Sequence, residues 1–251
     1  MLFAEKSIIT TEVNMTSSKR LFRPFFAAVT SAFLFLMLQG CDTTETTGGN
    51  VSLSFSPGTS LQKVNADVQL TEVKILLRDI KLEKESDGES EGEDETECEE
   101  VKVGPFVVVL NLNGTTTDFV VNNIPAGIYD ELKFEIHKLE ASETPPDPEF
   151  KDGDDSSLRY SVIAKGVFNS NPFVYKSKKS AHQELEFENM LIIEDNTSTN
   201  LTITVDPYTW FYKEGVLLNP TDPANDDDID HNIEHSFKKA FEDDDHDGED
   251  D

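Results

Sequence analysis

Hydrophobic and polar residues alternate along much of the chain after residue 50, and this period of two predicts β-strands. The segment NVSLSFSPG (50–58) places Val51, Leu53 and Phe55 on one face and serines on the other. Such a pattern is typical of a half-buried strand, with one face toward a core and the other toward solvent.

The segment LTEVKILLRDIKLEK (70–84) continues the alternation with one irregularity. Its apolar face shifts by one residue at Arg78-Asp79, which predicts a β-bulge or bend. A helix is the competing interpretation, because Leu, Lys and Glu are good helix formers, but the alternation favours a strand. The predicted apolar face consists of Val73, Ile75, Leu77, Ile80 and Leu82.

Further strand-like segments follow, and residues that favour turns separate them. A turn at Pro125 to Gly127 precedes a strand whose apolar positions are Tyr129, Leu132, Phe134 and Ile136. The other segments are FVVVLNLNG, TTTDFVVNN, LRYSVIAKGVF, PFVYKS, HQELEFEN and NLTITVDPYTWF. Eight or nine short strands at such spacing predict an antiparallel β-sandwich or barrel.

Two acidic segments interrupt the strands and predict loops. They are ESDGESEGEDETECEE (85–100) and SETPPDPEFKDGDDSS (142–157). Low hydrophobicity and high charge favour solvated loops. The sequence leaves open whether these loops line a site or keep the surface soluble.

The pattern changes to a period of 3.6 in ANDDDIDHNIEHSFKKAF (224–241). Its apolar stripe predicts an amphipathic C-terminal helix that packs against the β-domain. Aspartates at its start and lysines at its end suit the helix dipole. The stripe consists of Ile229, Ile233, Phe237, Ala240 and Phe241.

The start of the chain carries an export pattern. Lys19, Arg20 and Arg23 precede an apolar run from Phe25 to Leu38, which is too short for the roughly 20 residues of a membrane-spanning helix. A basic, then apolar, then small-residue order is typical of a secretory signal.

The end of that run, Leu38-Gln39-Gly40-Cys41, resembles the lipobox of bacterial lipoproteins. The resemblance implies cleavage before Cys41 and acylation of its thiol by a diacylglycerol, with palmitate among the acyl groups. The chain is then tied to a membrane of the bacterial cell envelope through Cys41, and the sequence does not decide between the inner and the outer membrane. Either Met1 or Met15 could be the true start.

Composition restricts the partners. Without residues 1–40 the chain keeps 48 acidic and 17 basic side chains, a formal charge of −31. Nucleic acid is excluded as a partner, because phosphate binding needs clustered Lys and Arg. Only Cys98 remains as a thiol once Cys41 is acylated, so no intrachain disulfide can form.

The segment NIPAGIYDELKF (123–134) resembles a turn found in prealbumin-like β-sandwiches. The order ADVQLTEVKILLRDIKLE, then NIPAGIY, then DPYTWF is similar to exported bacterial lipoproteins that carry domain of unknown function 4382. The resemblance covers residues 50–212 and implies a prealbumin- or Ig-like β-sandwich at the cell envelope. It leaves the function open.

Two patterns predict metal binding. Asp243, Asp245, Asp247 and Asp251, with Gly248 between them, fit the spacing of calcium loops, in which alternate carboxylates converge on one ion. A solvated acidic tail is the alternative interpretation.

The second pattern is HNIEH, which matches the H-x-x-E-H arrangement of inverted zinc peptidases. His231 and His235 would hold zinc and Glu234 would be the general base. At 100° per residue, however, both histidines lie about 200° from Ile229 and Ile233 and point to solvent.

These observations predict a non-enzymatic binding or structural module, with calcium as its only expected cofactor and an envelope protein or glycan as its ligand. The alternative is an exported metal-dependent hydrolase that uses His231, Glu234 and His235. The predicted organisation is a cleaved signal (1–40), a tether (41–49), the β-sandwich (50–212), a loop and helix (213–241), and an acidic tail or calcium loop (242–251).

Overall fold

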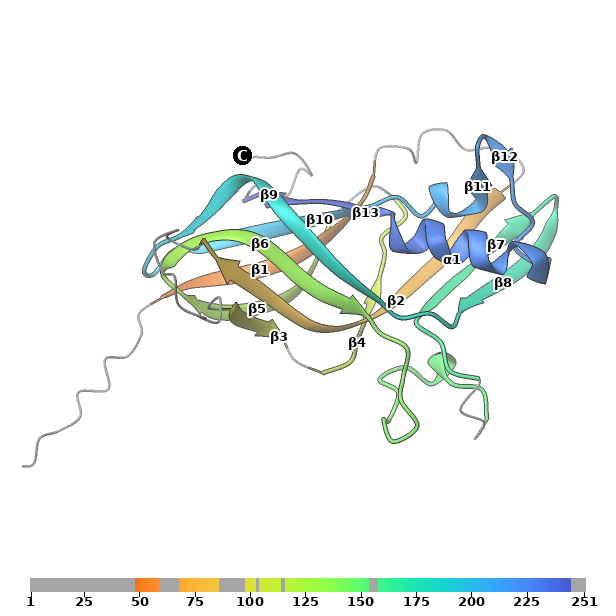
Figure 1. The fold of residues 1–251 in the computed structure, drawn as a ribbon, viewed down its shortest axis with the longest axis horizontal. Helices are drawn as coiled ribbons and strands as arrows, with labels where there is room; N and C mark the ends of the chain where they lie inside the picture. Colours follow the sequence, from red (N-terminus) through yellow and green to blue (C-terminus); the bar gives the residue numbers. More distant parts are fainter. Residues whose placement is uncertain are drawn as a thin grey trace, which may run out of the picture. The chain divides into compact units, whose positions relative to one another are not determined.

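A computed structural model describes residues 48–58, 68–85, 98–102, 104–113, 116–153 and 158–244. The chain divides into two units, Met1–Thr43 and Thr44–Asp251. The first unit lies outside the described residues, and with it Cys41. The described part of the second unit is mainly β, as predicted (Figure 1).

The strands form two larger sheets and one small one. The first sheet has the order β13-β10-β1-β5 and the second has the order β8-β7-β2-β6-β9, with β3 and β4 also paired to β2. The first sheet consists of β1 (Gly48–Pro57), β5 (Thr117–Pro125), β10 (Ser198–Val205) and β13 (Phe237–Glu242). The second consists of β2 (Val68–Lys84), β3 (Cys98–Lys102), β4 (Phe106–Val109), β6 (Gly127–Ile136), β7 (Val162–Phe168), β8 (Asn171–Ser177) and β9 (Ala181–Ile193).

Short elements complete the described part. A two-stranded sheet joins β11 (Tyr212–Lys213) to β12 (Val216–Leu217). The helical turns are η2 (Pro148–Phe150), η3 (Thr209–Phe211) and η4 (Pro223–Asn225), and the α-helix is α1 (Asp226–Glu234).

Strand β1 lies in the interior of the first sheet and has a neighbour on each side. It pairs in antiparallel fashion with β5, where Gly48 lies opposite Pro125, and in parallel with β10, where Leu53 lies opposite Leu201. The other strand pairs of the described residues are antiparallel. Assembly of the first sheet therefore requires contacts between distant parts of the chain.

Strand β2 is long and contains the predicted bulge. The register of its pairing with β6 shifts between Arg78 and Lys81, and Asp79 has a left-handed backbone with φ of 55°. The strand interpretation is therefore confirmed over the helical one. The irregular step returns Ile80 and Leu82 to the buried face that Val73, Ile75 and Leu77 occupy, and all five side chains are fully buried.

Both larger sheets contribute to one hydrophobic cluster. Leu53 and Phe55 of β1 belong to the same cluster as Ile75 of β2 and Phe134 of β6. The rings of Phe134 and Phe237 meet edge to face with centroids 5.3 Å apart, which connects β6 to β13. The predicted apolar faces of these strands are thus confirmed as the core.

The predicted C-terminal helix is wrong in its second half. The helix α1 ends at Glu234, and Phe237–Glu242 forms strand β13 beside β10. A bulge between Thr204 and Val205 in the pairing with β13 leaves Phe237 and Ala240 both buried, although three positions separate them. Because a bulged strand can bury positions three apart, its pattern imitates a helical stripe.

Candidate functional site

Of the four predicted calcium ligands, Asp243 is the one within the described residues, and Asp245, Asp247 and Asp251 lie outside them. The side chain of Asp243 is fully buried, and its carboxylate accepts a hydrogen bond of 2.8 Å from the hydroxyl of Thr202. The backbone N–H of Asp243 donates to the carbonyl oxygen of Asn200. Asp243 is thus a structural partner of β10 in this arrangement.

Ser54 and Ser56 on the polar face of β1 are also buried, so the half-buried strand predicted from the sequence is wrong on this face. Asn200 connects the serines of this face to the neighbouring strands. Ser52 and Ser54 donate to the side-chain oxygen of Asn200 at 2.8 and 2.9 Å, and its amide group donates to the carbonyl oxygen of Asp243 at 2.9 Å. Buried polar groups are stable only when they are hydrogen-bonded. The serines of β1 therefore join β1, β10 and the residues after β13.

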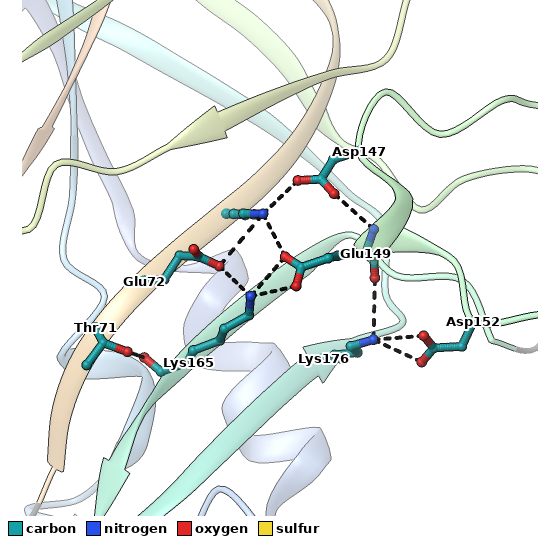
Figure 2. A network of polar contacts seen from close by, with 8 residues as sticks. Thr71, Glu72, Asp147, Glu149, Asp152, Lys165 and Lys176 are labelled. Carbon is teal, nitrogen blue, oxygen red and sulfur yellow. Dashed lines mark hydrogen bonds and ion pairs between the residues drawn. The ribbon is translucent and has the colours of Figure 1, made fainter.

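The described part of the second acidic loop is held on the outer face of the second sheet by lysines. Lys74 of β2 contacts Asp147 at 2.7 Å and Glu149 at 2.6 Å. Lys165 of β7 contacts Glu149 at 2.6 Å and Glu72 at 2.7 Å (Figure 2). The hydrogen bond from Lys74 lowers the pKa of Asp147 below its ordinary value, and those from Lys165 and Lys74 lower the pKa of Glu149. These carboxylates therefore stay ionised.

A small hydrophobic cluster lies under the same loop. Phe150 of η2 is fully buried and packs with Leu76, Leu139, Tyr160 and Ile163. Beyond it, Lys176 of β8 contacts Asp152 at 2.9 Å, and that carboxylate also accepts a hydrogen bond from Tyr160. Within residues 142–153, the carboxylates of Asp147, Glu149 and Asp152 thus hold the loop to the sheet.

A buried polar cluster, which the sequence did not predict, lies next to this loop. His137 is 2% exposed, and its Nδ1 and Nε2 lie 3.1 Å from Glu135 and 2.7 Å from Glu143. Arg78 donates to the Oε2 atom of Glu135 at 2.7 Å. Burial raises the pKa of Glu143, but hydrogen bonds from the Glu140 N–H and from His137 lower this pKa overall.

The two ring nitrogens of His137 point in opposite directions, so its carboxylates do not converge on one point. The arrangement fixes the segment after β6 to the bulge of β2. Glu135 and His137 alternate along one face of the chain, which is the signal that sequence could have offered, whereas nothing in the sequence placed Glu143 beside them.

The helix α1 packs through the residues predicted to be buried, since Ile229 is 0% and Ile233 3% exposed. The amide group of Asn232 donates to the carbonyl oxygens of Trp210 and Tyr212 at 2.9 and 2.8 Å. Tyr175 of β8 donates to the carboxylate of Asp230 at 2.7 Å, and burial followed by this hydrogen bond raises the pKa of Tyr175. The helix is thus fixed to β8, η3 and β11.

The structure brings His231, Glu234 and His235 together on the exposed face of α1. Their potential ligand atoms all lie within 4.8 Å of one another, and the two imidazole rings have centroids 4.1 Å apart. The prediction that both histidines face solvent is confirmed. Two imidazoles and a carboxylate can hold a transition-metal ion.

A cavity of about 160 Å³ lies beside this face, between α1 and the turn from β8 to β9. Its polar lining is mixed in charge and includes Lys179, Ser180, Asp227, Asp230, His231 and Glu234. A second cavity of about 230 Å³ lies near the β2 bulge and includes Asp79, Lys133, Glu135 and His182. The first cavity is the candidate site, because it adjoins the His231/Glu234/His235 cluster.

No family model, curated protein or solved structure matches this chain. Within the described residues, the helices are too short or too polar to span a bilayer.

Proposed function

We propose that the protein is a lipid-anchored lipoprotein of the bacterial cell envelope whose β-domain acts as a non-enzymatic binding or structural module. The observation that carries the proposal is the lipobox-like Leu38-Gln39-Gly40-Cys41 after a basic and apolar segment. Strand β1, the first strand of the described residues, begins at Gly48, seven residues after Cys41. A tether of that length spans at most about 25 Å, so acyl chains on Cys41 would keep the domain at the membrane surface.

We further propose that the domain is a β-sandwich of the prealbumin-like kind. Its support is the single hydrophobic cluster to which β1 and β10 of one sheet and β2 and β6 of the other contribute. Sandwich domains bury the facing sides of two sheets in this way. The NIPAGIY turn contributes as well, since Tyr129 is fully buried and its hydroxyl donates to the Pro125 carbonyl at 2.8 Å.

The end of the domain that carries Gly48 has a surface suited to a membrane. Ile128, Met190 and Ile192 are 44, 52 and 57% exposed, and Ile128 lies directly opposite Ile192 in the β6–β9 pairing. Gly48 lies opposite Pro125, which is three residues before Ile128. We define Ile128, Met190 and Ile192 as the apolar patch and propose that it rests on the lipid surface.

The opposite end of the sheets carries α1 and the β7–β8 hairpin (Figure 1). With the apolar patch on the membrane, this end faces away from it and is available to an envelope protein or glycan. The exposure of His231, Glu234 and His235 favours such a module over the alternative hydrolase, because zinc hydrolases place their metal in a cleft that restricts water. Calcium at the terminal aspartates is part of the proposal as a stabilising ion.

The lipid anchor is tested by expressing the full chain in a bacterium and labelling cells with an alkyne fatty acid. We expect label on the wild-type protein and recovery in the membrane fraction. Cys41→Ser should abolish both, whereas Cys98→Ser should leave both unchanged. Equal labelling of wild type and Cys41→Ser would reject the anchor.

The module is tested by chemical cross-linking in intact cells, followed by purification from detergent-solubilised envelope. We expect one envelope component to cross-link in defined proportion and to be lost when surface residues around the α1 cavity, such as Lys179, are changed to Glu. Turnover of a peptide, ester or glycan library that His231→Ala abolishes would instead establish the hydrolase.

A further inference from the structure

The last turn of α1 and its C-cap residue display His231, Glu234 and His235 on one exposed face. The opposite face carries the buried Ile229 and Ile233. Side chains four residues apart on a helix lie one above the other. The rigid packing of the helix on its apolar side, and the Asn232 hydrogen bonds to Trp210 and Tyr212, fix the backbone from which these side chains extend.

Their spacing suits a tetrahedral metal. Bonds of about 2.0 to 2.1 Å at tetrahedral angles place ligand atoms about 3.3 Å from each other. One candidate ligand atom from each of the three residues already lies within 4.8 Å of the other two. Because all three side chains are exposed, small rotations about their side-chain bonds close the remaining difference without disturbing the core.

One histidine is oriented in the manner of a metal ligand. The Nδ1 atom of His235 lies 2.8 Å from the carbonyl oxygen of His231. A carbonyl oxygen only accepts hydrogen bonds, so Nδ1 carries the proton and Nε2 keeps its lone pair. Histidines that bind metals usually donate their other N–H to such a carbonyl or carboxylate, which fixes the tautomer and the ring orientation.

The surroundings favour a cation. Asp227, Asp230 and Glu234 line the adjacent cavity with His231, and the basic residue of that lining, Lys179, lies 3.5 Å from Asp227 with 62% of its side chain exposed. The whole chain carries a formal charge of −29. A strongly negative protein attracts divalent cations to its surface.

We propose that His231, Glu234 and His235 form a binding site for one divalent transition-metal ion of the zinc class. Two imidazoles and one carboxylate exclude Ca²⁺ and Mg²⁺ as preferred ions, because those ions take oxygen ligands. The fourth position of the metal faces water or a donor group from a partner beside the cavity. The site links His231 to His235 and so stabilises the end of α1, independently of the lipid anchor and of the terminal aspartates.

The test is calorimetric titration of the purified full chain with Zn²⁺. We expect one site whose affinity falls about tenfold or more in His231→Ala, in His235→Ala and in Glu234→Gln. His182→Ala removes an exposed histidine of β9 and is the matched control, which should bind as wild type does. A large excess of Ca²⁺ should leave Zn²⁺ binding unchanged.

A second measurement keeps the test valid if His235→Ala disturbs the helix end. In wild type, substoichiometric Ni²⁺ should broaden the ring NMR signals of His231 and His235 before those of His182. The proposal is overturned if wild type binds no Zn²⁺, if the three variants bind it as tightly as wild type, or if Ca²⁺ displaces it. Broadening of His182 first would also overturn it.

Discussion

The ammonium group of Lys74 lies 2.6 Å from a carboxylate oxygen of Glu149, although 75 positions separate the two residues in the chain. The same ammonium group lies 2.7 Å from Asp147, and the side chain of Lys74 is 14% exposed. Hydrogen bonds to charged groups contribute more to stability than hydrogen bonds between neutral groups. One lysine on the outer face of β2 thus holds Asp147, which caps η2, and Glu149 within η2, and keeps Phe150 over its small hydrophobic cluster.

Replacing Lys74 by Met should release this loop. We expect the free energy of unfolding to fall by about 1 to 3 kcal/mol, since two carboxylates lose a shared charged donor. Urea denaturation measures the loss, and limited proteolysis should show faster cleavage within residues 142–153. Lys238→Met, which changes an exposed lysine of β13, is the control and should leave both unchanged. Equal effects of the two variants would contradict the assigned role of Lys74.

The same ion pairs predict a dependence of stability on pH. The pKa values of Asp147 and Glu149 are lowered from ordinary values of 3.8 and 4.5. A carboxyl whose pKa is lower in the folded state stabilises the fold above its unfolded pKa, and this contribution disappears as the pH falls through the folded pKa. Denaturation series between about pH 6 and pH 3 should therefore show a steeper loss below about pH 5 in wild type than in Lys74→Met. Parallel curves would exclude these carboxylates as the source.

Asn232 should be important for the position of α1, because its amide group satisfies two backbone carbonyls at once. Asn232→Ala leaves both carbonyls without that donor, so we expect a loss of about 1 to 3 kcal/mol. Asn171→Ala, at an exposed position of β8, is the control for loss of an asparagine. Chemical denaturation compares the two, and hydrogen exchange of α1 amides should increase in the first variant alone.

The structural role of Asp243 can be tested separately from the proposed calcium binding of the terminal aspartates. Asp243→Asn should lower the melting temperature even in chelator, because the buried carboxylate accepts a hydrogen bond from Thr202. Asp247→Asn should leave the melting temperature in chelator unchanged and remove only the rise produced by millimolar Ca²⁺. At a Ca²⁺ concentration a hundredfold above the dissociation constant, we expect the free energy of unfolding of wild type to rise by about 2.7 kcal/mol. No effect of Ca²⁺ on wild type would reject the calcium proposal and leave a solvated tail.

The proposed contact of the apolar patch with the membrane can be tested with a fluorescent probe. The chain has one tryptophan, Trp210, which is fully buried. In the lipidated full chain on phosphatidylcholine vesicles, Ile192→Trp should be quenched by nitroxide-labelled lipid. Val174→Trp, at an equally exposed position of β8, should not be quenched. Cys41→Ser should not bind the vesicles if the anchor is at Cys41. If Ile192→Trp binds the vesicles but is not quenched, the membrane contact of the apolar patch is rejected and the anchor is not.

Sequence patterns predicted the strands that pack on one continuous face. The bulge at Asp79 could be predicted because it shifts the apolar residues of β2 by one position, and the shift is visible without any knowledge of partners. The end of α1 could not, because Phe237, Ala240 and Phe241 satisfy both a helical stripe and a bulged strand. Only pairing with β10, which lies more than 30 residues earlier, decides between them.

The candidate sites divide in the same way. The His231/Glu234/His235 cluster could be predicted, since helical spacing brings its members together locally. The Arg78, Glu135, His137 and Glu143 cluster required the β2 bulge and the segment after β6 to meet in space. The carboxylates of residues 147–152 were predicted to lie in a solvated loop. Their contacts could not be predicted, because the lysines that bind them come from three different strands.

The position of β1 also determines the order in which this domain can assemble. The strand is the first of the described part to be synthesised, yet its parallel partner β10 follows by almost 150 residues. Until then one of its edges is open, and an unpaired strand edge can pair with other chains. Non-local pairing of this kind slows folding and prolongs the exposure of intermediates. In the nascent domain, an edge of β1 therefore stays unpaired until β10 has been made.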